Sequence, residues 1–202
     1  MTLVAFSDII QIAREWNSDG LLKSFVLSNI HGLSPNFING VKTVDYEETK
    51  QLYLHILDAY EKHQDWVVLK IFLDECLAYW KDRPIIDAGQ SVPMATCMPI
   101  NSKIYIDSQM QIGICEKVAD KYRIGNVKNG IDWKRANEIV EEYYHKRVER
   151  CKYCPAIRMC DMCLTAVEYS DEQWDILCHN ERVYAQIFMF LYCEMAERGL
   201  IK

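Results

Sequence analysis

The stretch that decides the fold is Cys151-Lys-Tyr-Cys154-Pro-Ala-Ile-Arg-Met-Cys160-Asp-Met-Cys163, in which four cysteines follow the spacing CxxCx5CxxC. Two thiolates three residues apart in a turn can bind one soft metal ion or one corner of an iron–sulfur cluster, and a distant ligand can complete the site. Three more cysteines surround the stretch, two before it and one after it. We interpret the whole set as metal ligands: Cys97, Cys115, Cys151, Cys154, Cys160, Cys163 and Cys178.

The alternative is that these cysteines only fill the core, where free cysteine is common. Seven cysteines in one part of the chain, with two CxxC pairs, are too many for that interpretation. It does suit Cys76 and Cys193, which neighbour apolar residues in helical patterns, and we exclude both from the metal set. The chain opens without a basic or long apolar signal segment, so a reducing compartment is expected and metal ligation is favoured over disulfides.

Bulk composition limits the classes of partner. The chain has 202 residues, 50% apolar and 26% charged, which is ordinary for one large or two small folded domains. A net charge of −6 argues against non-specific nucleic-acid binding, and no apolar run reaches 18 residues. We therefore expect a cytoplasmic protein without nucleic-acid or membrane partners. The segment 116–163 carries 11 Lys/Arg against 8 Asp/Glu, a positive background that suits anionic thiolate sites.

The sequence pattern predicts that the first 90 residues are mostly helical. Ser7 can cap an amphipathic helix that ends before Asp19, and 22–30 could form a buried strand. Apolar residues at helical spacing predict further helices over 46–63 and 66–80, the second ending before Pro84.

After a linker at 84–94 the pattern changes. Residues 103–106 and 111–114 predict a β-hairpin around a loop at 107–110, where Asp107 is interpreted as a turn former. Residues 125–130 form a second turn region. Asp132 can cap a helix that leads to Cys151, Ser170 begins a capping signal before Cys178, and 183–198 predict a final helix ending at Gly199. The expected fold class is α+β.

Two metals compete for the cysteines. Zinc needs four ligands, which the CxxCx5CxxC stretch could supply alone, but zinc ribbons separate their CxxC pairs by more residues. Close cysteine triads with a remote fourth ligand fit cubane clusters better, and seven ligands suit two clusters. The spacing favours iron–sulfur over zinc without excluding either.

Several features follow one another along the chain: Cys97, a hairpin, Cys115-Glu-Lys-Val, Ile124-Gly-Asn-Val, Gly130-Ile-Asp, CxxCx5CxxC and Cys178. Their order resembles that of the SPASM domain of radical S-adenosylmethionine enzymes, in particular the maturases of ribosomally made peptides. The resemblance implies two auxiliary [4Fe–4S] clusters. It assigns Cys151, Cys154, Cys160 and Cys178 to the outer cluster and Cys97, Cys115 and Cys163 to the inner one, whose fourth site is open or filled from elsewhere.

Three departures from that family are visible. Met110 stands where the family usually has glycine, so we expect a differently built hairpin turn, and two residues rather than the common three separate the last cysteine pair. The CxxxCxxC motif that binds the S-adenosylmethionine cluster is absent. We therefore expect no S-adenosylmethionine binding and no radical formation by this chain alone.

The resemblance implies a helical segment 1–90 similar to the last part of a radical-enzyme barrel and a SPASM-like domain over 91–202. The expected function is cluster-based electron transfer or peptide positioning, with a barrel-containing protein and a precursor peptide as partners, or else a truncated gene product. The alternatives are a structural zinc module for protein–protein recognition and an electron carrier that works alone.

Overall fold

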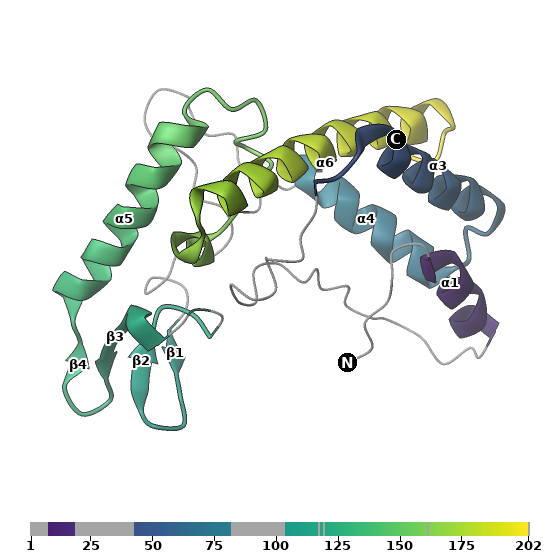
Figure 1. Ribbon diagram of the computed structural model, residues 1–202. Coiled ribbons are helices and arrows are strands. Elements are labelled where there is room, and N and C mark those ends of the chain that lie inside the picture. Colours follow the sequence, from purple (N-terminus) through teal and green to yellow (C-terminus); the bar gives the residue numbers. More distant parts are fainter. Residues whose placement is uncertain are drawn as a thin grey trace. The chain divides into compact units, whose positions relative to one another are not determined.

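The computed structural model describes residues 8–18, 43–81, 104–116, 118, 120–160 and 162–201 (Figure 1). These residues are mainly helical, with five α-helices and one four-stranded antiparallel sheet, so the expected mixture of α and β is confirmed. They fall into two compact units. Unit 1 holds 8–18, 44–81 and 183–201, and unit 2 holds residue 43 and the described residues of 104–182. Cys97, the possible strand at 22–30 and the linker at 84–94 lie outside the described residues.

Unit 1 is built from helices that share one apolar core. It contains α1 (Ile9–Ser18), α3 (Tyr46–Lys62), α4 (Val67–Lys81) and the second half of α6 (Asp171–Glu197). The carboxylate of Asp45 accepts from the Glu48 backbone N–H at 2.8 Å and so caps α3. The three helices expected in the first 90 residues are therefore confirmed. Their buried faces meet through apolar side chains that include Ile56, Leu57, Leu69, Leu73, Leu77 and Ile187.

Unit 2 begins with a sheet of four short strands in the order β1-β2-β3-β4 (Figure 1). The strands are β1 (Tyr105–Ile106), β2 (Gln111–Gly113), β3 (Arg123–Asn126) and β4 (Gly130–Ile131). The first hairpin was predicted. The region expected only as a turn, 125–130, instead joins β3 to β4 in a second antiparallel hairpin. Gly125 has φ +145°, and a Cβ there would overlap the carbonyl of Gly130, so this close pairing needs glycine.

The first hairpin turns around the carboxylate of Asp107. Its Oδ1 accepts from the backbone N–H groups of Gln109 and Gln111 at 2.8 and 2.9 Å, which confirms its role as a turn former. Met110 has φ +60°, the left-handed conformation that glycine adopts most readily. The turn thus closes without a glycine because Met110 itself takes this conformation.

Helix α5 (Trp133–Cys151) leads from the sheet to the cysteine-rich stretch. Asp132 caps it by accepting from the Arg135 backbone N–H at 3.0 Å, as predicted. The buried stripe of α5 runs through Ala136, Ile139, Tyr143, Arg147 and Cys151, which follow one another at intervals of three or four residues. Cys151 is therefore the last core residue of the helix.

Helix α6 is longer than the sequence pattern predicted. Ser170 and Gln173 form a reciprocal capping box, and the helix then runs without a break through the expected start at Val183. It stops before Gly199, whose φ is +68°, as expected. Because residues 183–201 belong to unit 1, the observed units differ from the expected division at residue 90.

No helix among the described residues combines the length and apolar character needed to cross a membrane.

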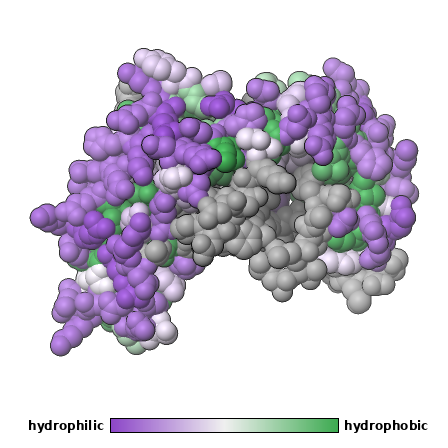
Figure 2. All heavy atoms as spheres, viewed as in Figure 1, coloured by the Kyte–Doolittle hydropathy of each residue, from purple (hydrophilic) through white to green (hydrophobic). Residues whose placement is uncertain are grey.

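The face of unit 2 seen in the space-filling view is largely hydrophilic, with apolar residues showing only in small areas between polar ones (Figure 2).

Candidate metal centre

Four thiols of unit 2 are electrostatic neighbours. The charge of Cys154 raises the pKa of Cys151, and that of Cys151 raises the pKa of Cys160. Cys178, on the first half of α6, joins them, because the charges of Cys151 and Cys154 both raise its pKa. The chain thus brings the end of α5, the following loop and α6 to one place.

The loop between these cysteines is a series of tight backbone turns. The Cys154 N–H donates to the Cys151 carbonyl at 2.9 Å, and the Ile157 N–H donates to the Cys154 carbonyl at 3.2 Å. The Cys160 N–H then closes a turn on the Ala156 carbonyl at 2.9 Å. Helix α5 ends at Cys151, four residues before Pro155, a residue that disfavours helix.

Burial raises the pKa of three of these thiols, those of Cys151, Cys160 and Cys178. It raises the pKa of Cys160 to about 12, with a further increase from Glu181 and a decrease from Arg147. Burial likewise raises the pKa of Cys178 to about 11, where Cys151 adds to the effect and Arg182 opposes it. Thiolates are the form that binds metals, so a metal group entering this site must displace protons.

Three guanidinium groups act electrostatically on the thiol of Cys151. Burial raises the pKa of Cys151, while the positive charges of Arg147, Arg150 and Arg182 lower it. Four thiolates and their inorganic core would carry net negative charge, which nearby cations offset. Two of these arginines, Arg147 and Arg150, belong to the positive segment 116–163.

The second cysteine pair is held through the carbonyl of Met162, which lies between Cys160 and Cys163 in sequence. Tyr143 Oη donates to this carbonyl at 2.7 Å and Arg147 Nη1 at 2.9 Å, both from the buried stripe of α5. Arg147 Nη1 also donates to Tyr143 Oη at 3.1 Å. Cys163 then begins the short 3-10 helix η3 (Leu164–Glu168).

The start of α6 is tied to α5 and η3, which positions Cys178. Arg150 donates to Asp171 at 2.8 Å and to Asp175 at 2.6 Å. Trp174, fully buried between these contacts, donates its indole N–H to the Ala166 carbonyl at 2.9 Å. Ionic contacts at the surface and a buried aromatic anchor thus set the register of the helix that carries Cys178.

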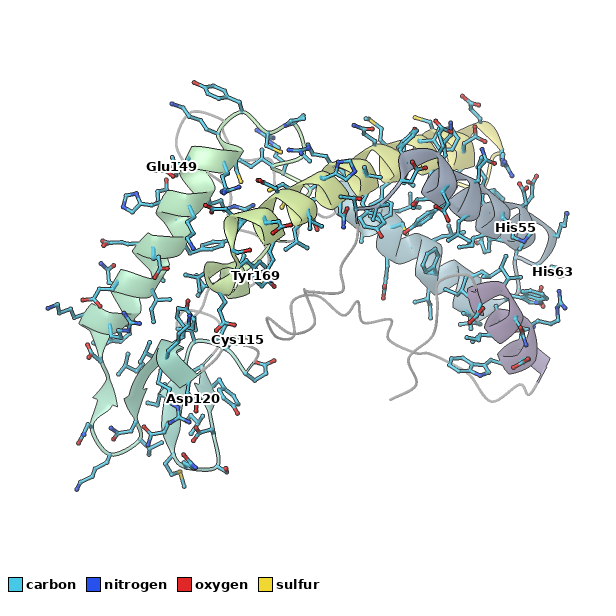
Figure 3. The ribbon with its side chains drawn as sticks, viewed as in Figure 1. His55, His63, Cys115, Asp120, Glu149 and Tyr169 are labelled. Carbon is cyan, nitrogen blue, oxygen red and sulfur yellow. The ribbon has the colours of Figure 1, made fainter. Side chains whose placement is uncertain are left out.

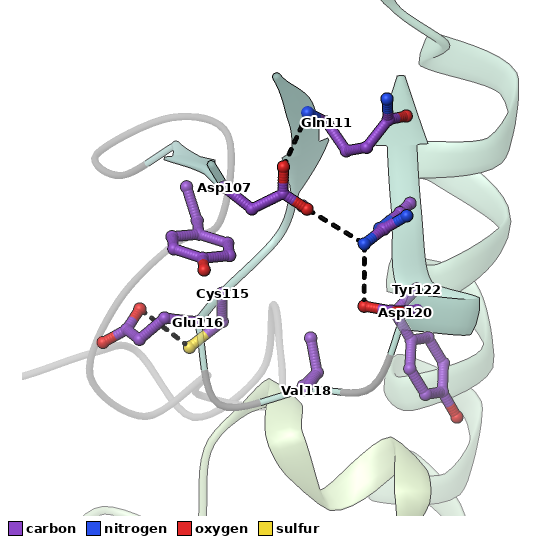
Figure 4. Close-up of a pocket in the computed structure, with 10 residues that line it drawn as sticks. Asp107, Gln111, Cys115, Glu116, Val118, Asp120 and Tyr122 are labelled. Carbon is purple, nitrogen blue, oxygen red and sulfur yellow. Dashed lines mark hydrogen bonds and ion pairs between the residues drawn. The ribbon is translucent and has the colours of Figure 1, made fainter. Parts of the chain in front are cut away.

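Cys115 lies at a different place in unit 2. It lines a pocket of about 110 Å³ beside the sheet (Figure 4). Its thiol donates to the Glu116 carboxylate at 3.4 Å, and Arg123 Nη2 joins Asp107 and Asp120 at 2.9 and 3.0 Å. Cys115 and Cys178 both pack against the unit 2 core to which Cys160 belongs. The charged side chains of Glu116, Arg123, Asp107 and Asp120 interact with other residues of the pocket lining, so we assign the pocket no chemistry of its own.

The seven predicted ligands therefore have three outcomes. Cys151 interacts electrostatically with Cys154, Cys160 and Cys178, Cys115 and Cys163 belong to the same unit, and Cys97 falls outside the described residues. Within the described ranges, no three His, Cys, Asp or Glu side chains are arranged as a set that could hold a metal ion. By their chemistry, the thiol donors suit a soft metal group.

The residues excluded from the metal set lie elsewhere. Cys76 and Cys193 belong to unit 1, where Cys76 is buried in the core as predicted. The same prediction is wrong for Cys193, which lies on an exposed position of α6 although its neighbours in sequence are apolar. His55 and His63 also belong to unit 1, on α3 and at its end (Figure 3). Neither histidine contributes to the group of four thiols.

The most informative residue missed by sequence analysis is Arg147. Arg147 lies outside the cysteine loop, on the buried face of α5, and its side chain contacts Cys160 from within the core. A usable signal existed, since Arg147 interrupts an otherwise apolar stripe at the spacing 139, 143, 147, 151.

No protein-family model matches the chain, and neither a curated protein nor a solved structure matches it.

Proposed function

We propose that this protein binds iron–sulfur clusters through its cysteines and acts as the auxiliary-cluster part of a radical S-adenosylmethionine peptide-modifying system. The observation that carries the proposal is the electrostatic proximity of Cys151, Cys154, Cys160 and Cys178. They are the four residues that the resemblance to the SPASM domain assigns to its outer cluster. The finer fold description, a SPASM-like domain, is part of this proposal.

The membership of Cys178 favours a cluster over the zinc alternative. A zinc site built from the two CxxC pairs alone would not use Cys178. Yet Cys178 interacts with both Cys151 and Cys154, although it lies on α6 and far along the chain. Neighbouring cysteines with a remote final ligand are the usual arrangement of cubane clusters.

The residues of this chain would then hold and tune the cluster, which supplies one-electron transfer when bound. Cys151, Cys154, Cys160 and Cys178 would be its ligands. Arg147, Arg150 and Arg182 would offset its negative charge. Cys115 and Cys163, with Cys97, would serve a second cluster, as the resemblance implies.

The radical chemistry itself is assigned to a partner. The chain contains no CxxxCxxC motif, so we propose that a barrel-containing polypeptide supplies the S-adenosylmethionine cluster and that a precursor peptide is the substrate. Co-purification with such a polypeptide would support this part of the proposal. An electron-transfer activity that needs no barrel partner would instead support the carrier alternative.

Anaerobic reconstitution with iron and sulfide tests cluster binding directly. About eight irons and eight sulfides per chain would indicate two cubanes, and about four of each would indicate one. Cys154→Ala is expected to lower the iron content by about one cluster, whereas Cys193→Ala, at an exposed position in unit 1, should not. A colourless protein that holds only zinc would refute the proposal in favour of a zinc module.

A further inference from the structure

A charged side chain occupies the interior beside the cysteine group. Arg147 is 0% exposed, on the buried face of α5 between Tyr143 and Cys151. Burial lowers the pKa of its guanidinium, but Tyr143, Cys160 and Cys151 raise it, so the group stays charged. The groups that favour its charge include two of the proposed ligands.

Placing a guanidinium in a core is costly. The desolvation of a buried ion amounts to several kcal/mol unless hydrogen bonds and opposite charge compensate it. A methionine or leucine at position 147 would continue the apolar stripe without this cost. The chain instead carries the residue whose planar, multi-donor group can serve several acceptors at once.

The acceptors of Arg147 are the parts of the second cysteine turn. Its Nη1 donates to the Met162 carbonyl at 2.9 Å, and its side chain forms a hydrogen bond with Cys160. The Met162 backbone N–H also donates to Cys160 Sγ at 3.4 Å. Arg147 thereby links the sulfur of Cys160 to the backbone that separates Cys160 from Cys163.

We infer that Arg147 is a positioning residue that offsets the thiolate charge of the cysteine site from inside the core and fixes the turn between Cys160 and Cys163. When a metal group binds, the thiolates of Cys160 and Cys151 become permanently anionic. The guanidinium, already charged and buried beside them, then stabilises the loaded state more than the protonated one. This inference rests on the proposed cysteine site, but it holds for any thiolate-bound metal group there.

Three variants of the full chain separate charge from packing. Arg147→Met removes the charge and fits the apolar stripe, whereas Arg147→Lys keeps the charge and loses the planar pair of donors. Arg135→Met is the matched control, since it removes the same charge from the first turn of the same helix, where Arg135 contacts Glu138. Circular dichroism and thermal unfolding check that each variant is folded.

The first readout is anaerobic binding of Co²⁺, followed by its thiolate charge-transfer absorption. Arg147→Met should bind Co²⁺ about 10- to 100-fold more weakly than wild type, as is typical when a residue supporting metal ligands is lost. Arg147→Lys should lie in between, and Arg135→Met should match wild type. The second readout is the reduction potential after iron–sulfur reconstitution, which should become more negative in Arg147→Met and recover in Arg147→Lys.

The outcomes distinguish this inference from the proposed function. If wild type loads iron and sulfide but Arg147→Met keeps its Co²⁺ affinity and potential, the inference is overturned and the proposed function stands. If wild type loads no cluster but Co²⁺ binding weakens selectively in Arg147→Met, the inference stands and the proposed function fails. Should Arg147→Met not fold, a wild-type Co²⁺ affinity in Arg147→Lys would overturn the inference.

Discussion

Replacing Tyr143 by phenylalanine removes one oxygen atom from the centre of unit 2. The hydroxyl donates to the Met162 carbonyl at 2.7 Å and accepts from Arg147 at 3.1 Å. The ring stays in place, so the change tests this hydrogen-bond network with little change in packing. Burial raises the pKa of Tyr143 well above its ordinary value, so the phenol is neutral throughout the working pH range.

The magnitude follows from what remains after the change. A buried carbonyl left without any partner would cost about 1–3 kcal/mol, but the Met162 carbonyl keeps its bond from Arg147 at 2.9 Å. The expected loss is therefore about 1–2 kcal/mol. Because about 1.4 kcal/mol corresponds to a factor of ten, amide exchange from the most protected parts of unit 2 should speed up about five- to thirty-fold.

Hydrogen–deuterium exchange read by mass spectrometry measures this effect unit by unit. Peptides of α5 and η3 should exchange faster in Tyr143→Phe, while peptides of α3 and α4 in unit 1 serve as an internal reference. Tyr144→Phe is the control on the same helix, because Tyr144 is only partly buried. Equal exchange of unit 2 in the two variants would refute the assigned role of the Tyr143 hydroxyl.

Four further outcomes are expected. Cys76 is 6% exposed, and burial raises its pKa to about 12. It should therefore resist iodoacetamide at pH 8 until the protein is denatured, whereas the exposed Cys193 should react at once. Labelling of both cysteines at the same rate would contradict this prediction. Because the unfolded thiol ionises near its ordinary pKa of 9.0 and the folded thiol has a pKa of about 12, Cys76 should make unit 1 less stable as pH rises above about 9. A urea titration across this range would show the loss of stability. Trp174→Phe removes the indole N–H that donates to the Ala166 carbonyl and should lower the free energy of unfolding of unit 2 by about 1–3 kcal/mol. Amide hydrogens of η3 and of the start of α6 should then exchange faster. Unchanged exchange would count against the role of Trp174 as an anchor. Met110→Gly should stabilise the first hairpin by about 0.5–1 kcal/mol, because glycine adopts the left-handed conformation at φ +60° without strain. The amides of the hairpin should exchange more slowly in this variant. Faster exchange would contradict the prediction.

Local signals in the sequence were sufficient for several elements. The capping carboxylate of Asp132, the turn-forming Asp107 and the capping box at Ser170 each act within four residues of their partners. Interactions this short depend little on the rest of the fold, which explains why the starts of α5 and α6 and the first hairpin were predictable. The core position of Cys76 followed from helical spacing in the same way.

Other features escaped local reasoning. The strands β3 and β4 are only four and two residues long, and Gly125 at their centre reads as a turn unless the pairing with Gly130 is known. The break expected before Val183 does not occur, because no residue there ends the helix that starts at Asp171. In both cases a short stretch of sequence does not show what forms there: the pairing of two short strands in one case and an uninterrupted helix in the other.

The amino-acid sequence by itself determined which residue types were available for metal chemistry and where the helices and hairpin begin, since spacing and capping are local properties. Tertiary structure alone decided which thiols become neighbours, because Cys178 approaches Cys151 only after α6 packs against α5 through Arg150 and Trp174. It also decided that the buried Arg147 contacts the sulfur of Cys160. Long-range packing sets the surroundings of a charge, and a charge acts on a thiol through distance in space and not through distance along the chain.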